Sequence, residues 1–361
     1  MNPLTIIAFL FIFGLVVFLH ELGHFVTAKL ARIKVEEFGF GFPPRVFGIR
    51  RGETEYTINL IPIGGFVRML GEDDPKEPRS FARAPKRWRF AVLAAGATMN
   101  ILTAIVLFGA AFTTGWPTPT EFAVSIRTIV PGTPAEAAGL QPGDVVRTLA
   151  GRPINASGQL AQITQANRGR EIPMRVKRGD QELTLNVTPR ETWPDGQGPM
   201  GVVILDVPTK MALISYPVGE SLRMGAERTW EVIQLTLRVP VMAMQGQISA
   251  GEARPVGPVG IFQMTTEAAD VTIDTGLWYP VLTISALFSA AVGLANLLPI
   301  PGLDGGRLLF VGIEALRRRR IDPQKEGLVH LVGMAFLISL VVLVTYYDIT
   351  NPMPSVNWTL R

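Results

Sequence analysis

The sequence contains no cysteine and only three histidines, His20, His24 and His330, among its 361 residues. The absence of cysteine excludes disulfide scaffolds, thiolate-bound metal sites and cysteine nucleophiles. Charged residues are also few, at 18% of the chain, and 34 basic side chains are nearly balanced by 30 acidic ones. Such an even mixture, with a net charge of +4, does not favour a nucleic-acid-binding protein. The high hydrophobic content, 48%, excludes a disordered or fibrous chain.

Four long stretches of the chain are largely apolar. Residues 4–28 are uncharged apart from Glu21, residues 90–114 and 328–347 are uncharged throughout, and residues 277–316 begin with an uncharged run that prolines interrupt. About 20 apolar residues span a bilayer as a helix. A cleaved signal peptide is the alternative for the first stretch, but no basic residue precedes it, as such a peptide requires. The sequence therefore predicts a polytopic α-helical membrane protein with about four transmembrane helices.

The basic residues between these stretches predict the orientation of the chain in the membrane. Residues 29–89 contain 13 lysines and arginines against eight acidic residues, and the short segment 317–327 begins with four arginines. Cytoplasmic loops are enriched in lysine and arginine, so we expect both segments to be cytoplasmic. Both termini and the long segment between the second and third spans would then lie outside the cytoplasm.

Residues 121–190 have the character of a small water-exposed domain, with short apolar alternations, many glycines and prolines, and balanced charge. Residues 175–187 are typical of two strands joined by a turn at Arg178, Gly179 and Asp180. The segment resembles a PDZ domain of bacterial envelope proteases, and the residues that carry the resemblance are Pro134, Ala138, Gly139, Leu140, Gly143, Asp144 and Gly151. Such domains bind extended peptides at a sheet edge. A small module that serves only as a spacer is the alternative.

Residues 199–276 are predicted to form an extracytoplasmic region with one amphipathic helix. Over residues 220–244, apolar and charged side chains recur at helical spacings. This pattern favours a helix that lies on the membrane surface or on the protein itself. We expect Pro240 to end or kink the helix, and we expect residues 254–261 to form a loop that leads back to the membrane.

The first apolar stretch contains the motif H-E-x-x-H, at His20, Glu21 and His24. Residues four apart lie on one face of a helix, so both imidazoles can reach one metal ion, and the glutamate can act as general base on a water molecule. Ionisable groups inside a membrane span are costly and usually functional. Two histidines satisfied by hydrogen bonds within a helix bundle are the alternative.

The same argument calls for a third metal ligand. A catalytic zinc ion usually takes three protein ligands, and without cysteine the third must be a carboxylate at a similar depth in the membrane. Asp304 fits, because it follows residues 296–303, where prolines and glycine interrupt the apolar run. Backbone broken in this way must line a cavity or pack in protein. An aspartate that caps a helix at the membrane boundary is the alternative.

Together these motifs resemble the site-2 proteases, the bacterial intramembrane zinc metalloproteases of regulated intramembrane proteolysis. The resemblance rests on H-E-x-x-H in the first span, N-x-x-P-x-P-x-L-D-G at residues 296–305, and a PDZ-like domain between spans. Residues 38–43 and 56–68 resemble the family's cytoplasmic β segment, which dips toward the membrane and pairs with substrate. Some members carry two PDZ domains in tandem, whereas here only one is placed.

The resemblance implies one zinc ion per chain, with His20, His24 and Asp304 as ligands and Glu21 as the base. The residues that it implies in substrate binding lie at the broken helix and on the β segment, and they are Asn296, Pro299, Pro301, Tyr56, Ile58, Leu60, Gly64 and Gly65. It also implies a multi-pass protein of the bacterial cytoplasmic membrane, with its active site toward the cytoplasm. Its substrates would be single-span membrane proteins, such as anti-sigma factors and remnant signal peptides.

Two other functions fit parts of the sequence. A membrane scaffold that binds peptides through its PDZ-like domain would have the same fold, but an inactive protein has no need of Glu21. A metal transporter would also bury histidine and aspartate, but it would need more polar residues across several spans than the sequence contains. We therefore predict a zinc-dependent intramembrane endopeptidase.

Overall fold

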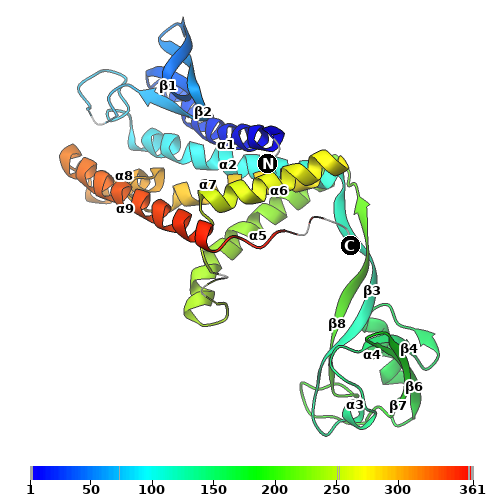
Figure 1. Ribbon diagram of the computed structural model, residues 1–361. Helices are drawn as coiled ribbons and strands as arrows, with labels where there is room; N and C mark the ends of the chain where they lie inside the picture. Colours follow the sequence, from blue (N-terminus) through cyan, green and yellow to red (C-terminus); the bar gives the residue numbers. More distant parts are fainter. Residues whose placement is uncertain (1–2, 73, 250, 252, 357, 359–361) are drawn as a thin grey trace. The chain divides into compact units, whose positions relative to one another are not determined.

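The chain forms two compact units in the computed structural model, which describes residues 3–72, 74–249, 251, 253–356 and 358 (Figure 1). The membrane unit comprises the chain up to Trp116 together with Ser215–Trp358. The β/α unit comprises Pro117–Ile214.

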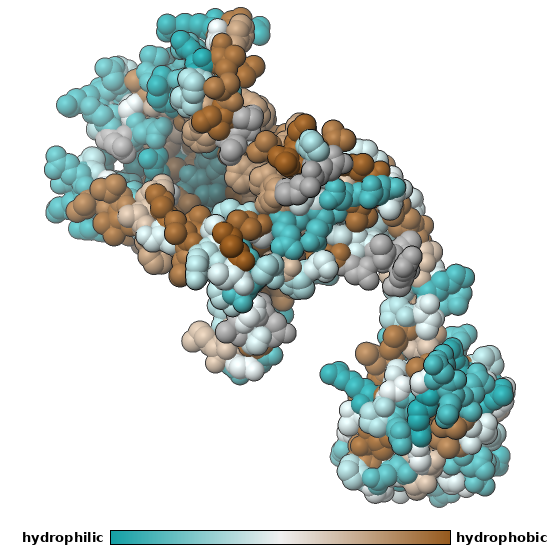
Figure 2. Space-filling model, viewed as in Figure 1, coloured by the Kyte–Doolittle hydropathy of each residue, from teal (hydrophilic) through white to brown (hydrophobic). Residues whose placement is uncertain are grey.

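Helices make up most of the membrane unit. They are α1 (Pro3–Leu30), α2 (Lys86–Thr114), α5 (Val218–Met244), α6 (Pro258–Thr275), α7 (Tyr279–Leu297), α8 (Asp304–Arg317) and α9 (Pro323–Thr350). Four of them, α1, α2, α7 and α9, are long and apolar enough to cross a bilayer. Figure 2 shows apolar side chains on the outer surface of this unit, and many of them belong to α9. The unit therefore fits the predicted polytopic membrane protein.

Glycines bring the backbones of neighbouring helices close to α2. A Cβ atom on Gly23 of α1 would lie 2.4 Å from the carbonyl oxygen of Ala95. A Cβ atom on Gly225 of α5 would lie 2.5 Å from the carbonyl oxygen of Ile105. Small residues allow this close approach between helices in membranes. They let α1 and α5 pack directly on α2.

The region between the β/α unit and α7 fits its sequence prediction in part. α5 packs on α2 through buried Ser221, Gly225 and Thr229, and it continues past Pro240, which removes one backbone donor without ending the helix. The expected loop at residues 254–261 already contains the start of α6. Pro258 in the first turn is a typical helix start.

A buried ion pair ties the first turn of α2 to the end of α8. Arg89 Nη1 donates to Glu314 Oε2 at 2.6 Å, and both side chains are at least nine-tenths buried. Lys86 Nζ also donates to the Glu314 carbonyl oxygen at 2.8 Å. Breaking such a pair by removing one partner costs about 3–5 kcal/mol. The pair therefore holds α8 in position along α2.

The two strands of the membrane unit are β1 (Val35–Arg51) and β2 (Thr54–Met69). They pair antiparallel, and each bends so that the pair forms four sheet segments. Residues 54–59 lie in the middle, between residues 35–40 and residues 45–51. Residues 65–69 pair only with the 35–40 segment among the residues that the structure describes, so they form an outer edge.

The β/α unit contains the elements β3 (Trp116–Ile129), α3 (Pro134–Ala137), β4 (Val145–Leu149), β5 (Arg152–Pro153), α4 (Ser157–Ala166), β6 (Ile172–Arg178), β7 (Gln181–Val187) and β8 (Val202–Ile214). Its strand order is β7-β6-β4-β3-β8, with β5 beside β4. The core includes the fully buried side chains of Val124, Leu149, Met174 and Val176. The unit reaches beyond the predicted range 121–190, because β8 adds an edge strand next to β3.

Candidate metal centre

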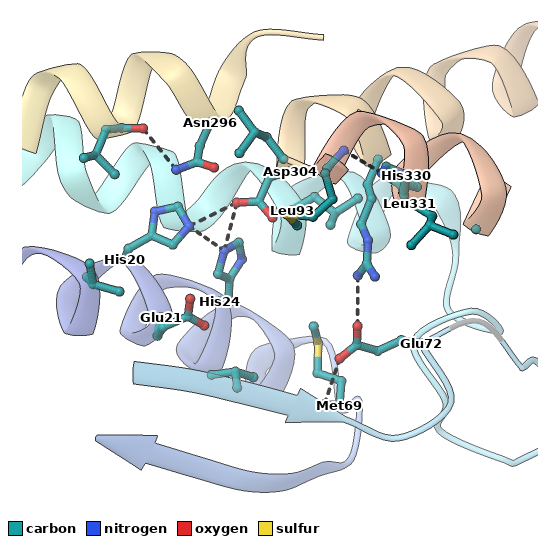
Figure 3. Close-up of a pocket in the computed structure, with 18 residues that line it drawn as sticks. His20, Glu21, His24, Met69, Glu72, Leu93, Asn296, Asp304, His330 and Leu331 are labelled. Carbon is teal, nitrogen blue, oxygen red and sulfur yellow. Dashed lines mark hydrogen bonds and ion pairs between the residues drawn. The ribbon is translucent and has the colours of Figure 1, made fainter. Parts of the chain in front are cut away.

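His20 and His24 lie one turn apart on one face of α1, and both side chains are buried. Gly96 of α2 makes room for them, because a Cβ atom there would lie 2.4 Å from His24 Nε2 and 2.7 Å from His20 Nε2. Asp304 is the first residue of α8, and its carboxylate points at both imidazoles (Figure 3). The three predicted ligands therefore meet, although the third follows the first by 284 positions.

The three donor atoms form a nearly equilateral triangle. Asp304 Oδ2 lies 3.0 Å from His20 Nε2 and 3.2 Å from His24 Nε2. The two nitrogen atoms are 3.1 Å apart. Ligands bound about 2.0 Å from a tetrahedral zinc ion lie about 3.3 Å from one another. Two imidazoles and one carboxylate are also a donor set of catalytic zinc sites, so these residues fit zinc.

Each imidazole has a second partner on α2. His24 Nδ1 donates to the Val92 carbonyl oxygen at 2.7 Å. A carbonyl oxygen only accepts, so the His24 proton lies on Nδ1 and Nε2 presents a lone pair toward the other two ligands. His20 Nδ1 lies 3.3 Å from Asn100 Nδ2. No sequence pattern indicated either partner.

A cavity of about 660 Å³ adjoins the three groups. Glu21 lines it next to the histidines, and Asn296 lines it from the last turn of α7 (Figure 3). Other walls come from β2 and α9. Its volume is in the range of protein pockets that hold small ligands. The catalytic base predicted from the sequence and the predicted ligands thus share one cavity.

Helix α9 supports the non-helical segment between α7 and α8. The Gly302 N–H donates to His330 Nδ1 at 3.0 Å. One turn along α9, a Cβ atom on Gly333 would lie 2.2 Å from the Pro301 carbonyl oxygen. Gly333 therefore lets α9 lie against the break, and His330 satisfies one of its backbone groups. Pro299 and Pro301 shape the break but do not line the cavity.

The structure does not place Tyr56 and Ile58 at a free strand edge. Tyr56 pairs with both Phe38 and Ile49, and Ile58 also has a partner on each side. Strand addition at these residues would require displacement of part of β1, and neither lines the cavity. Leu60 is exposed but also lies outside the cavity wall. The sequence could not show this, because it does not reveal that the strands bend back on one another.

The free edge at residues 65–69 is the part of β2 that reaches the cavity, through Val67 and its neighbours. Gly64 and Gly65 lie where this segment approaches α1. A Cβ atom on Gly65 would lie 3.7 Å from Glu21 Cγ, and Gly64 has a φ of +84°. Their lack of side chains allows the edge to lie beside the base.

An ion pair not identified from the sequence lies in the cavity wall. Arg307 Nη1 donates to Glu72 Oε2 at 2.9 Å, and Glu72 Oε1 accepts the Met69 N–H at 3.3 Å (Figure 3). Arg307 follows Asp304 by three residues, so the pair ties the start of α8 to the end of β2. Arg307 and Glu72 each lie close to a predicted motif, but no sequence pattern indicates that their side chains form an ion pair.

Comparisons with known proteins agree with this geometry. Residues 8–340 match the family model of Peptidase family M50. The zinc metalloprotease RasP of Oceanobacillus iheyensis is 30% identical, and the match covers 96% of this chain and 98% of the relative. RasP of Bacillus licheniformis is 31% identical with the same coverage. The regulator of sigma-W protease RasP of Bacillus subtilis is 29% identical, again over 96% and 98%.

The β/α unit also has a match among solved structures. A PDZ domain of an SdrC-like protein from Listeria monocytogenes matches 23% of this chain and 86% of its own chain. The identity is 17% and the TM-score is 0.21. A score this low establishes nothing about the unit.

Four helices able to span a membrane, together with two buried histidines and a partly buried aspartate that meet at one point, define a membrane-embedded metallopeptidase of the site-2 protease type. The chain belongs to Peptidase family M50, whose model it matches over most of its length. Its cofactor is zinc. The family, the enzyme class and the cofactor predicted from the sequence are thereby confirmed.

Proposed function

We propose that His20, His24 and Asp304 hold one zinc ion per chain, and that Glu21 is the base of a peptidase that cuts within membrane-spanning segments. The observation that carries this proposal is the meeting of the three donor atoms within 4.8 Å of one another, beside a cavity that Glu21 also lines. Polar groups buried together in a membrane protein are costly and usually mark a functional site.

Each residue of the centre has a distinct part in the proposed mechanism. A zinc ion would supply Lewis acidity, which polarises a peptide carbonyl and acidifies a water molecule. The Val92 carbonyl oxygen holds His24 in the tautomer that binds through Nε2. Glu21 accepts a proton from the attacking water at its carboxylate and passes it to the nitrogen of the leaving amine.

The substrate segment must be extended where it is cut, because a helix hides its carbonyl groups in its own hydrogen bonds. The free edge at residues 65–69 is suited to pair with such a segment beside Glu21. Asn296 donates one amide hydrogen to the Val292 carbonyl oxygen at 3.1 Å. Its second amide hydrogen can then hold a substrate carbonyl in the cavity.

The test combines zinc content with cleavage of a single-span reporter protein in membranes. Glu21→Gln is expected to keep about one zinc per chain and to lose cleavage by roughly 10²–10⁴-fold, the usual contribution of a general base. His20→Ala and Asp304→Ala are expected to lose zinc. Asp180→Ala, at an exposed position of the β/α unit, is the control and should change neither quantity.

The outcomes separate the parts of the proposal. Normal cleavage by Glu21→Gln would contradict the role of the base. Zinc that survives Asp304→Ala would contradict the third ligand. A zinc-loaded wild-type enzyme that cleaves no membrane protein would favour the scaffold that binds peptides through its PDZ-like domain.

We also propose that residues 29–89 face the cytoplasm and that the β/α unit, a PDZ-like domain, faces the other side. The charge distribution supports this orientation. Lys76→Cys and Asp180→Cys place single thiols at exposed positions in a chain that has no cysteine of its own. A membrane-impermeant thiol reagent is expected to label only Asp180→Cys in intact spheroplasts. Labelling of Lys76→Cys would contradict the orientation.

The proposed substrates are single-span membrane proteins, with anti-sigma factors and remnant signal peptides as the main classes. The name of the Bacillus subtilis relative, regulator of sigma-W protease, supports a role in sigma-factor regulation. Uncut substrates should accumulate in membranes of cells that carry Glu21→Gln in place of the wild type. Quantitative proteomics of those membranes would identify them, and an unchanged membrane proteome would contradict the proposal.

A further inference from the structure

Asn100 lies on α2 with its side chain fully buried against His20. Its Nδ2 is 3.3 Å from His20 Nδ1, and its Oδ1 has no hydrogen-bond partner in the described part of the chain. An amide oxygen buried without a partner costs about 1–3 kcal/mol. The proposed mechanism does not use this residue, so its burial needs another explanation.

Zinc binding sets a requirement on His20. A neutral imidazole carries one N–H, on either Nδ1 or Nε2. His20 Nε2 is the nitrogen that faces Asp304 and His24. It can bind a metal ion only through its lone pair, so the proton must then lie on Nδ1. An N–H on Nδ1 needs an acceptor, which the amide oxygen of Asn100 can provide after a half-turn of the amide group.

We propose that Asn100 is a positioning residue whose Oδ1 accepts a hydrogen bond from His20 Nδ1 and holds His20 in the tautomer that binds zinc. This inference rests on the zinc centre proposed above. Val92 serves His24 in the same way with its carbonyl oxygen. Both second partners come from α2, so one helix orients both histidines of the neighbouring helix.

The packing around Asn100 keeps the residue in place while leaving the amide group able to turn. Ser289 Oγ of α7 donates to the Asn100 carbonyl oxygen at 2.8 Å. A Cβ atom on Gly293, one turn further along α7, would lie 3.2 Å from the Asn100 Cβ. The backbone of Asn100 is therefore held by α7, and rotation of its terminal amide exchanges nitrogen and oxygen without a change in volume.

The test measures the zinc affinity of the purified full-length chain by competition with a chelator. Asn100→Leu has a similar size but no acceptor, and zinc binding should weaken about 10–100-fold, as for other second partners of zinc ligands. Asn100→Asp keeps an acceptor and should bind zinc nearly as the wild type does. Thr98→Ala is the control on the same helix, because the exposed Thr98 hydroxyl donates only to the Ala94 carbonyl oxygen, and this variant should bind zinc as the wild type does.

A second measurement reports the tautomer itself and does not depend on Asn100→Leu. The chain has three histidines, so ¹⁵N-histidine labelling gives a spectrum simple enough to assign by His→Gln variants. In the zinc-loaded wild type, the His20 proton should lie on Nδ1. In Asn100→Asp, the Nδ1 resonance should shift toward that of a stronger hydrogen bond.

Three results would overturn the role of Asn100. They are wild-type zinc affinity in Asn100→Leu, equal weakening in Asn100→Asp and Asn100→Leu, and a His20 proton on Nε2 in the zinc-loaded protein. A wild-type chain that binds no zinc would instead contradict the zinc centre on which the inference rests.

Discussion

Two aspartates, one in each unit, differ in what surrounds them. Asp144 in the β/α unit is fully buried, and donors fill its carboxylate: Arg178 Nε and Nη2 each donate at 2.8 Å, and the Gln141 N–H donates at 2.9 Å. Asp304 in the membrane unit has two imidazole nitrogens as its hydrogen-bonding neighbours, and its side chain is 21% exposed to a cavity.

The difference shows how a structural carboxylate can be told from one that is predicted to bind a metal ion. Burial alone would raise the pKa of Asp144, but the hydrogen bonds from Arg178 and Gln141 outweigh it and hold the pKa below its usual value. The charge of Asp144 is thus fully compensated by the protein. Among the described residues, the ion-pair partners of the Asp304 carboxylate are the two imidazoles, and the nearby Arg307 is paired with Glu72 instead. A metal ion at this site would supply the compensating positive charge.

The largest effect that would sharpen this comparison is expected for Gly96→Ala. The new Cβ would lie 2.4 Å from His24 Nε2, within the space of the ligands, so zinc affinity should fall by more than about 100-fold. Gly312→Ala in α8 is the control, because nothing lies within 4 Å of a Cβ there. Mass spectrometry would measure the zinc content of both variants. A normal zinc content in Gly96→Ala would contradict the placement of the two histidines against Gly96.

A smaller effect is expected when the break before Asp304 loses its support. His330→Leu removes the acceptor of the Gly302 N–H, which should loosen the segment and weaken zinc binding about 10-fold. His330→Gln keeps an acceptor and should restore much of the affinity. Chelator competition measures both variants, and equal affinities would show that the hydrogen bond does not position Asp304.

Asp144→Asn should affect stability and leave the zinc centre intact. It removes the charge that holds Arg178, whose side chain is 30% exposed, so the loss should be about 2 kcal/mol rather than that of a fully buried pair. Hydrogen exchange of the β4 and β6 amides in the whole chain measures this loss. A fall in zinc content in this variant would contradict the separation of the two centres.

The smallest effect is a pH dependence confined to the β/α unit. Because the pKa of Asp144 is lower in the folded unit than in the unfolded chain, its contribution to stability is complete above the unfolded pKa of about 3.9. It is lost as the pH falls through the folded value. The protection of the β4 amides, taken relative to their intrinsic exchange rates, should therefore fall below about pH 4. Asp144→Asn should lack this part of the dependence.

Local patterns made a large part of the protein predictable. The two histidines of the motif are one helical turn apart, and the apolar runs have the length of a bilayer, so both features follow from helix geometry alone. Asp304 was predicted as the third ligand because it follows a broken span, and the structure places its carboxylate beside the two imidazoles. The bent strands were not, because the pairing of Tyr56 with two segments of β1 depends on where the chain turns back.

The sequence by itself determined the family, the enzyme class and the apolar spans, and it predicted the donor residues and the base, because all of these depend on residue identity and short-range spacing. Only the tertiary structure decided which residues support that chemistry. Asn100, Val92 and His330 reach the centre because glycines bring helices close enough for their side chains and backbone to meet. Such contacts join residues far apart in the chain, and no local pattern records them.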